Sequence, residues 1–235
     1  MATPLDLQEQ EQLDELKHFW KKYGDLITWT LLLVFGALAA WNGYQYWQRG
    51  QATQASALYD EVERAAQSGD MAMLERSFSD MKDRYGRTTY AQQSGLLVAK
   101  VMDDKGNIDG AKAALAWVAD KTSDEGYQSI ARLRLAAVLM QANAYDEARK
   151  QLAGSFPAEF APLVADRIGD IDVLQGKKAE AVAQYGRAYK GFEAQSQYRR
   201  LVEVKLNALG VDPRAASGAA AAAPQAGASA TGESK

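Results

Sequence analysis

The sequence has 235 residues, of which 47% are hydrophobic, and its formal net charge is −3. This apolar content is ample for the core of one or two folded domains, and the balanced charge provides no basic face that could neutralise nucleic-acid phosphates. There is no cysteine, which excludes disulfide bonds, thiol catalysis, zinc sites with cysteine ligands and a lipoprotein anchor.

Residues 1–25 form an acidic lead-in with six carboxylates against three lysines. Leu13, Leu16, Trp20 and Tyr23 recur at intervals of three and four residues, which predicts a helix with one apolar face. Such a helix is either a solvated lead-in or an interfacial segment that runs on into the apolar stretch behind it. His18, the only histidine, lies here without the partners that a metal site or a catalytic triad requires.

Residues 26–48 contain no aspartate, glutamate, lysine or arginine over 23 positions. As a helix this segment would measure about 35 Å, which is enough to cross the hydrocarbon core of a bilayer. Aromatic residues gather at both ends, as expected for rings at the level of the lipid headgroups. These residues are Phe19, Trp20 and Tyr23 before the segment and Trp41, Tyr44, Tyr46 and Trp47 at its end. We therefore predict a single transmembrane helix.

Two alternatives stay open for this segment. Ala37 and Ala39 have the small-x-small spacing of a signal-peptidase site ahead of Ala40, and an apolar helix of this length could also be buried in a soluble core. Three lysines lie shortly before the segment, whereas only Arg49 follows it closely. By the positive-inside rule, this bias predicts a cytoplasmic N-terminus and, in a bacterium, a periplasmic remainder.

Residues 49–210 are predicted to form repeated pairs of helices. Turns of related sequence begin at Gly69, Gly106, Asn143 and Gly176, and their nearly regular spacing is close to the period of helix-turn-helix repeats. Glycine and asparagine tolerate the left-handed backbone conformation that often ends a helix. No segment shows the alternation typical of a strand. The pattern predicts an all-α solenoid of tetratricopeptide-like repeats.

Mostly small residues recur at fixed positions around these turns, where paired helices must approach closely. Five residues after each turn residue stand Leu74, Ala111, Ala148 and Ala181. Seven residues before it stand Val62, Ala99, Ala136 and Gly169. Each helix pair is therefore expected to cover the apolar face of its neighbour and to build a curved surface that binds peptides or proteins.

The register of the repeat places nine residues on this surface, although a place in the core is the simpler explanation for most of the apolar ones. They are Gln93, Leu96, Lys100, Ile130, Leu133, Ala137, Met140, Leu163 and Val173. Charged residues within apolar helices also predict an ion pair between repeats, with Arg132 or Arg134 on one side and Asp170 on the other. We expect this pair to have a structural role.

The remaining sequence shows no catalytic constellation. The glycines of GNIDGAK are too close together for a phosphate loop, and DDKGNID lacks a ligand that a calcium loop needs. We therefore expect neither an enzyme nor a cofactor. Residues 211–235 lack large apolar side chains apart from Val211, which predicts a disordered tail rich in alanine.

Four segments together resemble one known family over roughly residues 9–190. They are EQEQLDELKHFWKKYGDLI, WNGYQYWQRGQ, IARLRLAAVLM and DRIGD. The sequence is similar in them to the YfgM-type family of ancillary SecYEG translocon subunits. This resemblance implies a bacterial inner-membrane protein with a short cytoplasmic segment, one membrane span and a periplasmic tetratricopeptide-like domain.

The resemblance also implies partners, which are the Sec translocon and PpiD, a membrane-anchored periplasmic chaperone related to prolyl isomerases. The expected role is a non-enzymatic scaffold that helps newly exported chains pass from the channel to the periplasm. The alternative is a soluble periplasmic tetratricopeptide-like binding module, released by signal cleavage, with an unrelated partner.

Overall fold

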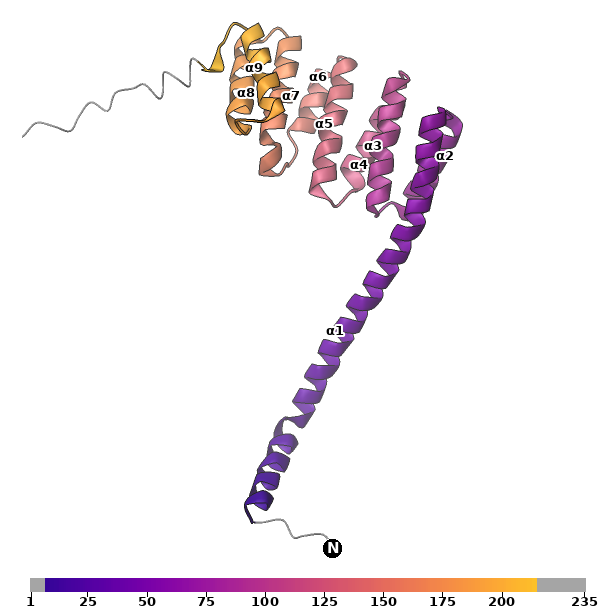
Figure 1. The fold of residues 1–235 in the computed structure, drawn as a ribbon, viewed down its shortest axis with the longest axis vertical. Coiled ribbons are helices and arrows are strands. Elements are labelled where there is room, and N and C mark those ends of the chain that lie inside the picture. Colours follow the sequence, from indigo (N-terminus) through magenta and orange to yellow (C-terminus); the bar gives the residue numbers. More distant parts are fainter. Residues whose placement is uncertain (1–6, 215–235) are drawn as a thin grey trace, which may run out of the picture. The chain divides into compact units, whose positions relative to one another are not determined.

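The computed structural model describes residues 7–214, and over this range the chain is helical without a β-strand (Figure 1). It divides into two compact units, Met1–Ser56 and Ala57–Lys235. The fold class predicted from the sequence is confirmed. Residues 215–235, which make up most of the predicted tail, lie outside the described range.

The first helix, α1, runs without a break over Leu7–Ser68. The predicted boundaries after residues 25 and 48 therefore lie inside one helix. An 18-residue window of α1 reaches a mean hydropathy of 1.6, and only 6% of that window is buried. Its large apolar side chains, such as Leu33 and Phe35, are exposed. The segment is therefore not the core helix of a globular unit, and α1 is long and apolar enough to cross a membrane once.

The second unit begins with the last turns of α1 and continues with eight α-helices and one 3₁₀ helix that pack side by side (Figure 1). These are α2 (Met71–Tyr85), α3 (Thr89–Asp104), α4 (Ile108–Lys121), α5 (Glu125–Gln141), α6 (Tyr145–Leu152), η1 (Ala158–Phe160), α7 (Ala161–Leu174), α8 (Lys178–Gly191) and α9 (Gln197–Ala208). Side chains cap the N-termini of several of these helices. At α2, for example, the carboxylate of Asp70 accepts a hydrogen bond from the backbone amide of Met73 at 2.9 Å.

All four predicted turn residues have positive φ, with 72° at Gly69, 76° at Gly106, 58° at Asn143 and 73° at Gly176. The residue types and spacing that predicted these turns are thus confirmed. A fifth turn of the same kind, which the sequence analysis missed, occurs at Gly210, where φ is 82°. In each pair the helix before the turn is the A helix, and the helix behind it is the B helix. The A helices are the end of α1, α3, α5, α7 and α9.

The small residues around the turns lie where the helices touch. The four residues that follow the turns by five positions are completely buried, and Val62, Ala99, Ala136 and Gly169 are buried too. At Gly169 an added Cβ would lie 2.6 Å from Cε1 of Tyr185 in α8. The repeat register read from the sequence is therefore the packing register of the solenoid.

Two clusters of buried apolar residues stabilise the solenoid. The larger one extends from the end of α1 to α7 and includes Leu74, Leu115 and Ile171. The smaller one joins α7, α8 and α9, with Tyr185 and Val202 among its members.

The fold also continues beyond the expected domain end at Gly210. Val211 packs against the smaller cluster, and Pro213 is buried. Nε of Arg214 lies 2.7 Å from a carboxylate oxygen of Glu203 in α9. Residues 211–214 are therefore part of the solenoid.

Candidate interaction surfaces

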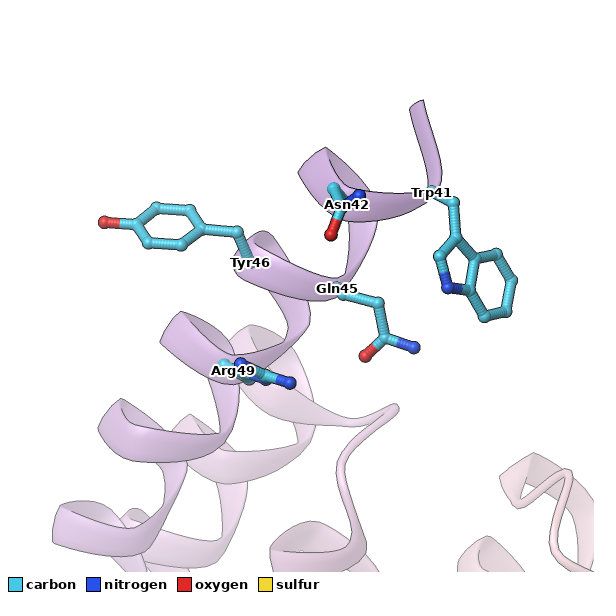
Figure 2. A pocket seen from close by; sticks show the side chains of 5 residues that line it. All are labelled: Trp41, Asn42, Gln45, Tyr46 and Arg49. Atoms are coloured by element: carbon cyan, nitrogen blue, oxygen red, sulfur yellow. The ribbon is translucent and has the colours of Figure 1, made fainter. Parts of the chain in front are cut away.

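The end of the apolar run in α1 carries polar and aromatic side chains around a shallow hollow of about 500 Å³. It is lined by Trp41, Asn42, Gln45, Tyr46 and Arg49, and Figure 2 shows Trp41 and Tyr46 pointing to opposite sides of the helix. Nδ2 of Asn42 donates to the carbonyl of Leu38 at 3.1 Å, which satisfies the amide within the helix. Amphipathic rings followed by an arginine suit the boundary between hydrocarbon and headgroups. This arrangement fits the end of a membrane anchor.

Tyrosines from three successive A helices meet on the solenoid. The rings of Tyr59 in α1 and Tyr90 in α3 are 5.8 Å apart between centroids. Nε2 of Gln93 in α3 donates to the hydroxyl of Tyr127 in α5 at 2.9 Å. Burial and the nearby carboxylate of Glu63 raise the pKa of Tyr59 above its ordinary value. All four ring or amide side chains are half-buried.

The nine residues predicted for the binding surface do not gather in one site, because they are distributed along α3, α5 and α7. Gln93 belongs to the tyrosine group. Lys100 is exposed, pairs with Asp104 at 2.7 Å and lines a hollow of about 310 Å³ between the end of α1 and α3. Leu96 lies in the larger core cluster, and Val173 is exposed. The other residues are half-buried: Ile130, Leu133, Ala137, Met140 and Leu163.

Three of these half-buried residues pack against the larger core cluster: Ile130, Leu133 and Met140. Their side chains therefore contribute to the core, and they also keep some exposed surface. A role of the nine residues in partner binding stays a prediction.

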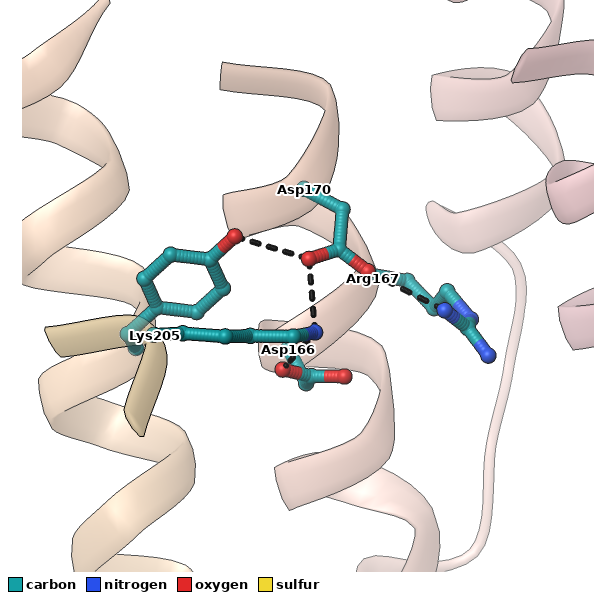
Figure 3. Close-up of polar contacts among 5 residues, drawn as sticks. Asp166, Arg167, Asp170 and Lys205 are labelled. Carbon is teal, nitrogen blue, oxygen red and sulfur yellow. Dashed lines mark hydrogen bonds and ion pairs between the residues drawn. The ribbon is translucent and has the colours of Figure 1, made fainter. Parts of the chain in front are cut away.

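A polar cluster joins the last three helices (Figure 3). Nζ of Lys205 in α9 lies 2.7 Å from Oδ1 of Asp166 and 2.6 Å from Oδ1 of Asp170, both in α7. The hydroxyl of Tyr185 in α8 donates to Asp170 at 2.7 Å, and Nη1 of Arg167 contacts the other oxygen of Asp170 at 3.0 Å. Two carboxylates therefore face two cations and a phenol.

The expected pairing of Asp170 with Arg132 or Arg134 is wrong. Asp170 follows Asp166 by one helical turn and shares its face of α7, which packs toward α9 rather than α5. Nη1 of Arg132 instead donates to the carbonyl of Ser155 at 3.2 Å, and Arg134 is exposed.

The link between α7 and the preceding pair is a different one. Arg149 in α6 pairs with the buried carboxylate of Asp172 and also donates to Oε1 of Gln175 at 3.1 Å. An ion pair between repeats is therefore present at α7, but it comes from α6 and involves another aspartate.

Burial raises the pKa of Asp166, whereas the hydrogen bond from Lys205 acts in the opposite direction. Burial and Asp170 likewise raise the pKa of the Tyr185 phenol. Among the described side chains, no group of three or more histidines, aspartates or glutamates is arranged to hold a metal ion. With its carboxylates occupied by Lys205 and Arg167, the cluster serves to connect helices.

Comparisons with known proteins agree with this architecture. A family model for a tetratricopeptide repeat-like domain matches residues 17–211. An ancillary SecYEG translocon subunit of Neisseria gonorrhoeae is 32% identical over 207 residues, which cover 86% of this chain and 98% of the relative. The chain belongs to the family of ancillary SecYEG translocon subunits.

Two further members of the family have the same extent. The protein of Haemophilus influenzae is 29% identical over 203 residues, and that of Escherichia coli is 26% identical over 206 residues. Each match covers 86% of this chain, with 98% and 97% of the respective relative. The matches therefore extend beyond the repeat domain into the long apolar helix.

Tyr59, Tyr90, Tyr127 and Lys205 were not predicted from the sequence. A signal for two of them was present, because Tyr90 precedes the turn residue Gly106 by the same interval as Tyr127 precedes Asn143. Lys205 would have been found by extending the repeat to a fifth turn.

Proposed function

We propose that this protein is a non-enzymatic scaffold, anchored in the bacterial inner membrane by one helix and associated with the SecYEG translocon. The observation that carries this proposal is the match to ancillary SecYEG translocon subunits over nearly their whole length. The apolar part of α1 and the helical solenoid lie on one chain, which suits a protein that must hold a binding surface beside a membrane channel.

In this proposal the N-terminus is cytoplasmic and the solenoid is periplasmic, as the lysines before the span favour. Anchoring confines the solenoid to the membrane surface and thereby raises its effective concentration toward membrane-bound partners. The solenoid contacts the translocon or a chaperone of the PpiD type, and newly exported chains pass along it into the periplasm.

The association is tested by crosslinking in cells, extraction in mild detergent and identification of the proteins that co-purify. We expect translocon components with the full chain. A matched control carries a cleavable export signal in place of residues 1–48, which leaves the solenoid periplasmic but untethered, and we expect it to recover much less translocon. Recovery of an unrelated envelope complex by the full chain contradicts the proposal.

The orientation has a separate test, because the sequence contains no natural cysteine. Single cysteines are introduced as Gln10→Cys and Ser229→Cys, and intact spheroplasts are treated with a membrane-impermeant thiol reagent. We expect labelling at position 229 only. Labelling at position 10 alone means that the protein has the opposite orientation.

A further inference from the structure

The group of tyrosines on the solenoid has the composition of a recognition site for a cation. We define the tyrosine cluster as Tyr59, Glu63, Tyr90, Gln93 and Tyr127. The centroids of the Tyr59 and Tyr90 rings are 5.8 Å apart, the carboxylate of Glu63 acts on the Tyr59 hydroxyl, and Nε2 of Gln93 is 2.9 Å from the hydroxyl of Tyr127. Three successive A helices thus contribute to one surface.

The repeat sets the place of two of these rings, Tyr90 and Tyr127. The interval along the chain is identical from Tyr90 to Gly106, from Tyr127 to Asn143 and from Phe160 to Gly176. Equivalent positions of successive units therefore carry an aromatic side chain at the start of the A helix. The rings of Tyr59, Tyr90 and Tyr127 are half-buried, so each keeps part of its surface accessible. Polar hydroxyls occur only at the two positions nearest to α1.

The charge next to the rings is negative. The ionisable groups that act most strongly on Tyr59 are Glu63, Tyr127 and Asp60, and both carboxylates come from α1. Within the part of the chain that the structure describes, Glu63 forms no ion pair. This differs from the polar cluster of α7 to α9, where lysine and arginine already occupy the aspartates. A carboxylate beside aromatic rings is complementary to a cation from outside.

We propose that the tyrosine cluster binds the side chain of a lysine or arginine in an extended segment of another protein. The ring faces attract the cation, Glu63 supplies the opposite charge, and the amide of Gln93 and the hydroxyls offer hydrogen bonds to the neighbouring peptide backbone. This inference rests on the proposed function, since it names the chemistry of a chain that the scaffold would receive.

The test is a titration of the purified full chain in mild detergent with a fluorescent, unstructured peptide that contains two leucines and one arginine. A matched peptide has the neutral isostere citrulline in place of arginine, and fluorescence anisotropy reports binding. We expect the arginine peptide to bind about 5- to 30-fold more tightly than the citrulline peptide, as a desolvated cation beside aromatic rings and a carboxylate allows.

Two variants locate the site. Glu63→Gln keeps the size of the side chain and Tyr90→Leu removes one ring, and each is expected to reduce the preference for arginine to less than about 3-fold. Glu180→Gln, an equal change of charge on the exposed start of α8, should leave the preference unchanged. Variants are compared only where circular dichroism and the Tm show an intact fold. If Tyr90→Leu unfolds, Tyr127→Leu replaces it as the variant that lacks one ring.

The inference is overturned if the arginine and citrulline peptides bind equally well. It is also overturned if folded Glu63→Gln and Tyr90→Leu variants prefer arginine as strongly as the unmodified chain does. A photoreactive arginine peptide gives a second readout, with crosslinks expected in α1, α3 or α5, whereas crosslinks confined to α7, α8 and α9 contradict the site. The titration contains no translocon. A failed co-purification with a retained arginine preference therefore refutes the proposed function and leaves the site intact.

Discussion

Replacing Lys205 by methionine tests how the last helix is attached. Its ammonium group lies 2.7 Å from Asp166 and 2.6 Å from Asp170, and Asp166 is only 6% exposed. Methionine preserves most of the apolar stem but leaves the Asp166 carboxylate buried without the lysine. Removing one partner of a buried ion pair costs about 3 to 5 kcal/mol. Asp170 adds little to this loss, since it still contacts Tyr185 and Arg167.

The loss should depend on pH with a definite sign. Burial already raises the folded-state pKa of Asp166 above 3.8, and without the opposing hydrogen bond from Lys205 it should rise further. A carboxyl whose pKa is higher in the folded state stabilises the fold when protonated, and that stabilisation is lost as the pH rises through the folded-state pKa. Lys205→Met should therefore be less destabilising at pH 5 than at pH 8.

The assay is thermal unfolding of the full chain in detergent at both pH values, with amide hydrogen exchange in α9 as a local readout. For a unit of this size, 1 kcal/mol corresponds to about 2 to 4 °C, so the Tm at pH 8 should fall by about 6 to 20 °C. Lys190→Met on the exposed end of α8 is the matched control and should change stability by less than about 0.5 kcal/mol. A loss below about 1 kcal/mol for Lys205→Met at pH 8 would show that Lys205 does not stabilise the buried carboxylate of Asp166.

Two further predictions concern glycines and use the same unfolding assay. Gly169→Ala should lower the free energy of unfolding by about 1 to 3 kcal/mol, because the new methyl group would overlap the ring of Tyr185. Gly186→Ala in α8 has open space around the new methyl group and should raise the free energy of unfolding by about 0.5 to 1 kcal/mol. Gly106→Ala should cost about 1 to 2 kcal/mol at its left-handed turn, and Asn143→Gly should be neutral or stabilising. Equal effects of the two alanine substitutions in α7 and α8, or a tolerated Gly106→Ala, would contradict the packing and the turn geometry respectively.

Much of the solenoid is visible in the sequence because its turns depend on residue type. Gly69, Gly106, Asn143 and Gly176 adopt the positive φ that few other residues tolerate, and their spacing reveals the repeat. The small residues around them are likewise set by local geometry, since a larger side chain at Gly169 would overlap Tyr185. Where one local constraint determines the residue, the sequence was a sufficient guide.

The surface and the ion pairs were less accessible to sequence reasoning. The same helical period places side chains in the core and on the curved face. The sequence pattern therefore could not tell that Leu96 is buried while Val173 is exposed. The partner of Asp170 depends on which helix packs against which face of α7. Lys205 lies 35 residues further along the chain, and its place follows only when Gly210 is recognised as a fifth turn.

The proposed function requires one uncut helix that holds the solenoid at the membrane. The intact mass of the protein extracted from membranes tests this claim directly, because cleavage at the small residues before Ala40 would remove the whole lead-in together with most of the apolar segment. We expect the mass of the full chain, 25.6 kDa, in the detergent-extracted membrane fraction. A detergent-independent soluble species that begins at Ala40 would contradict the account.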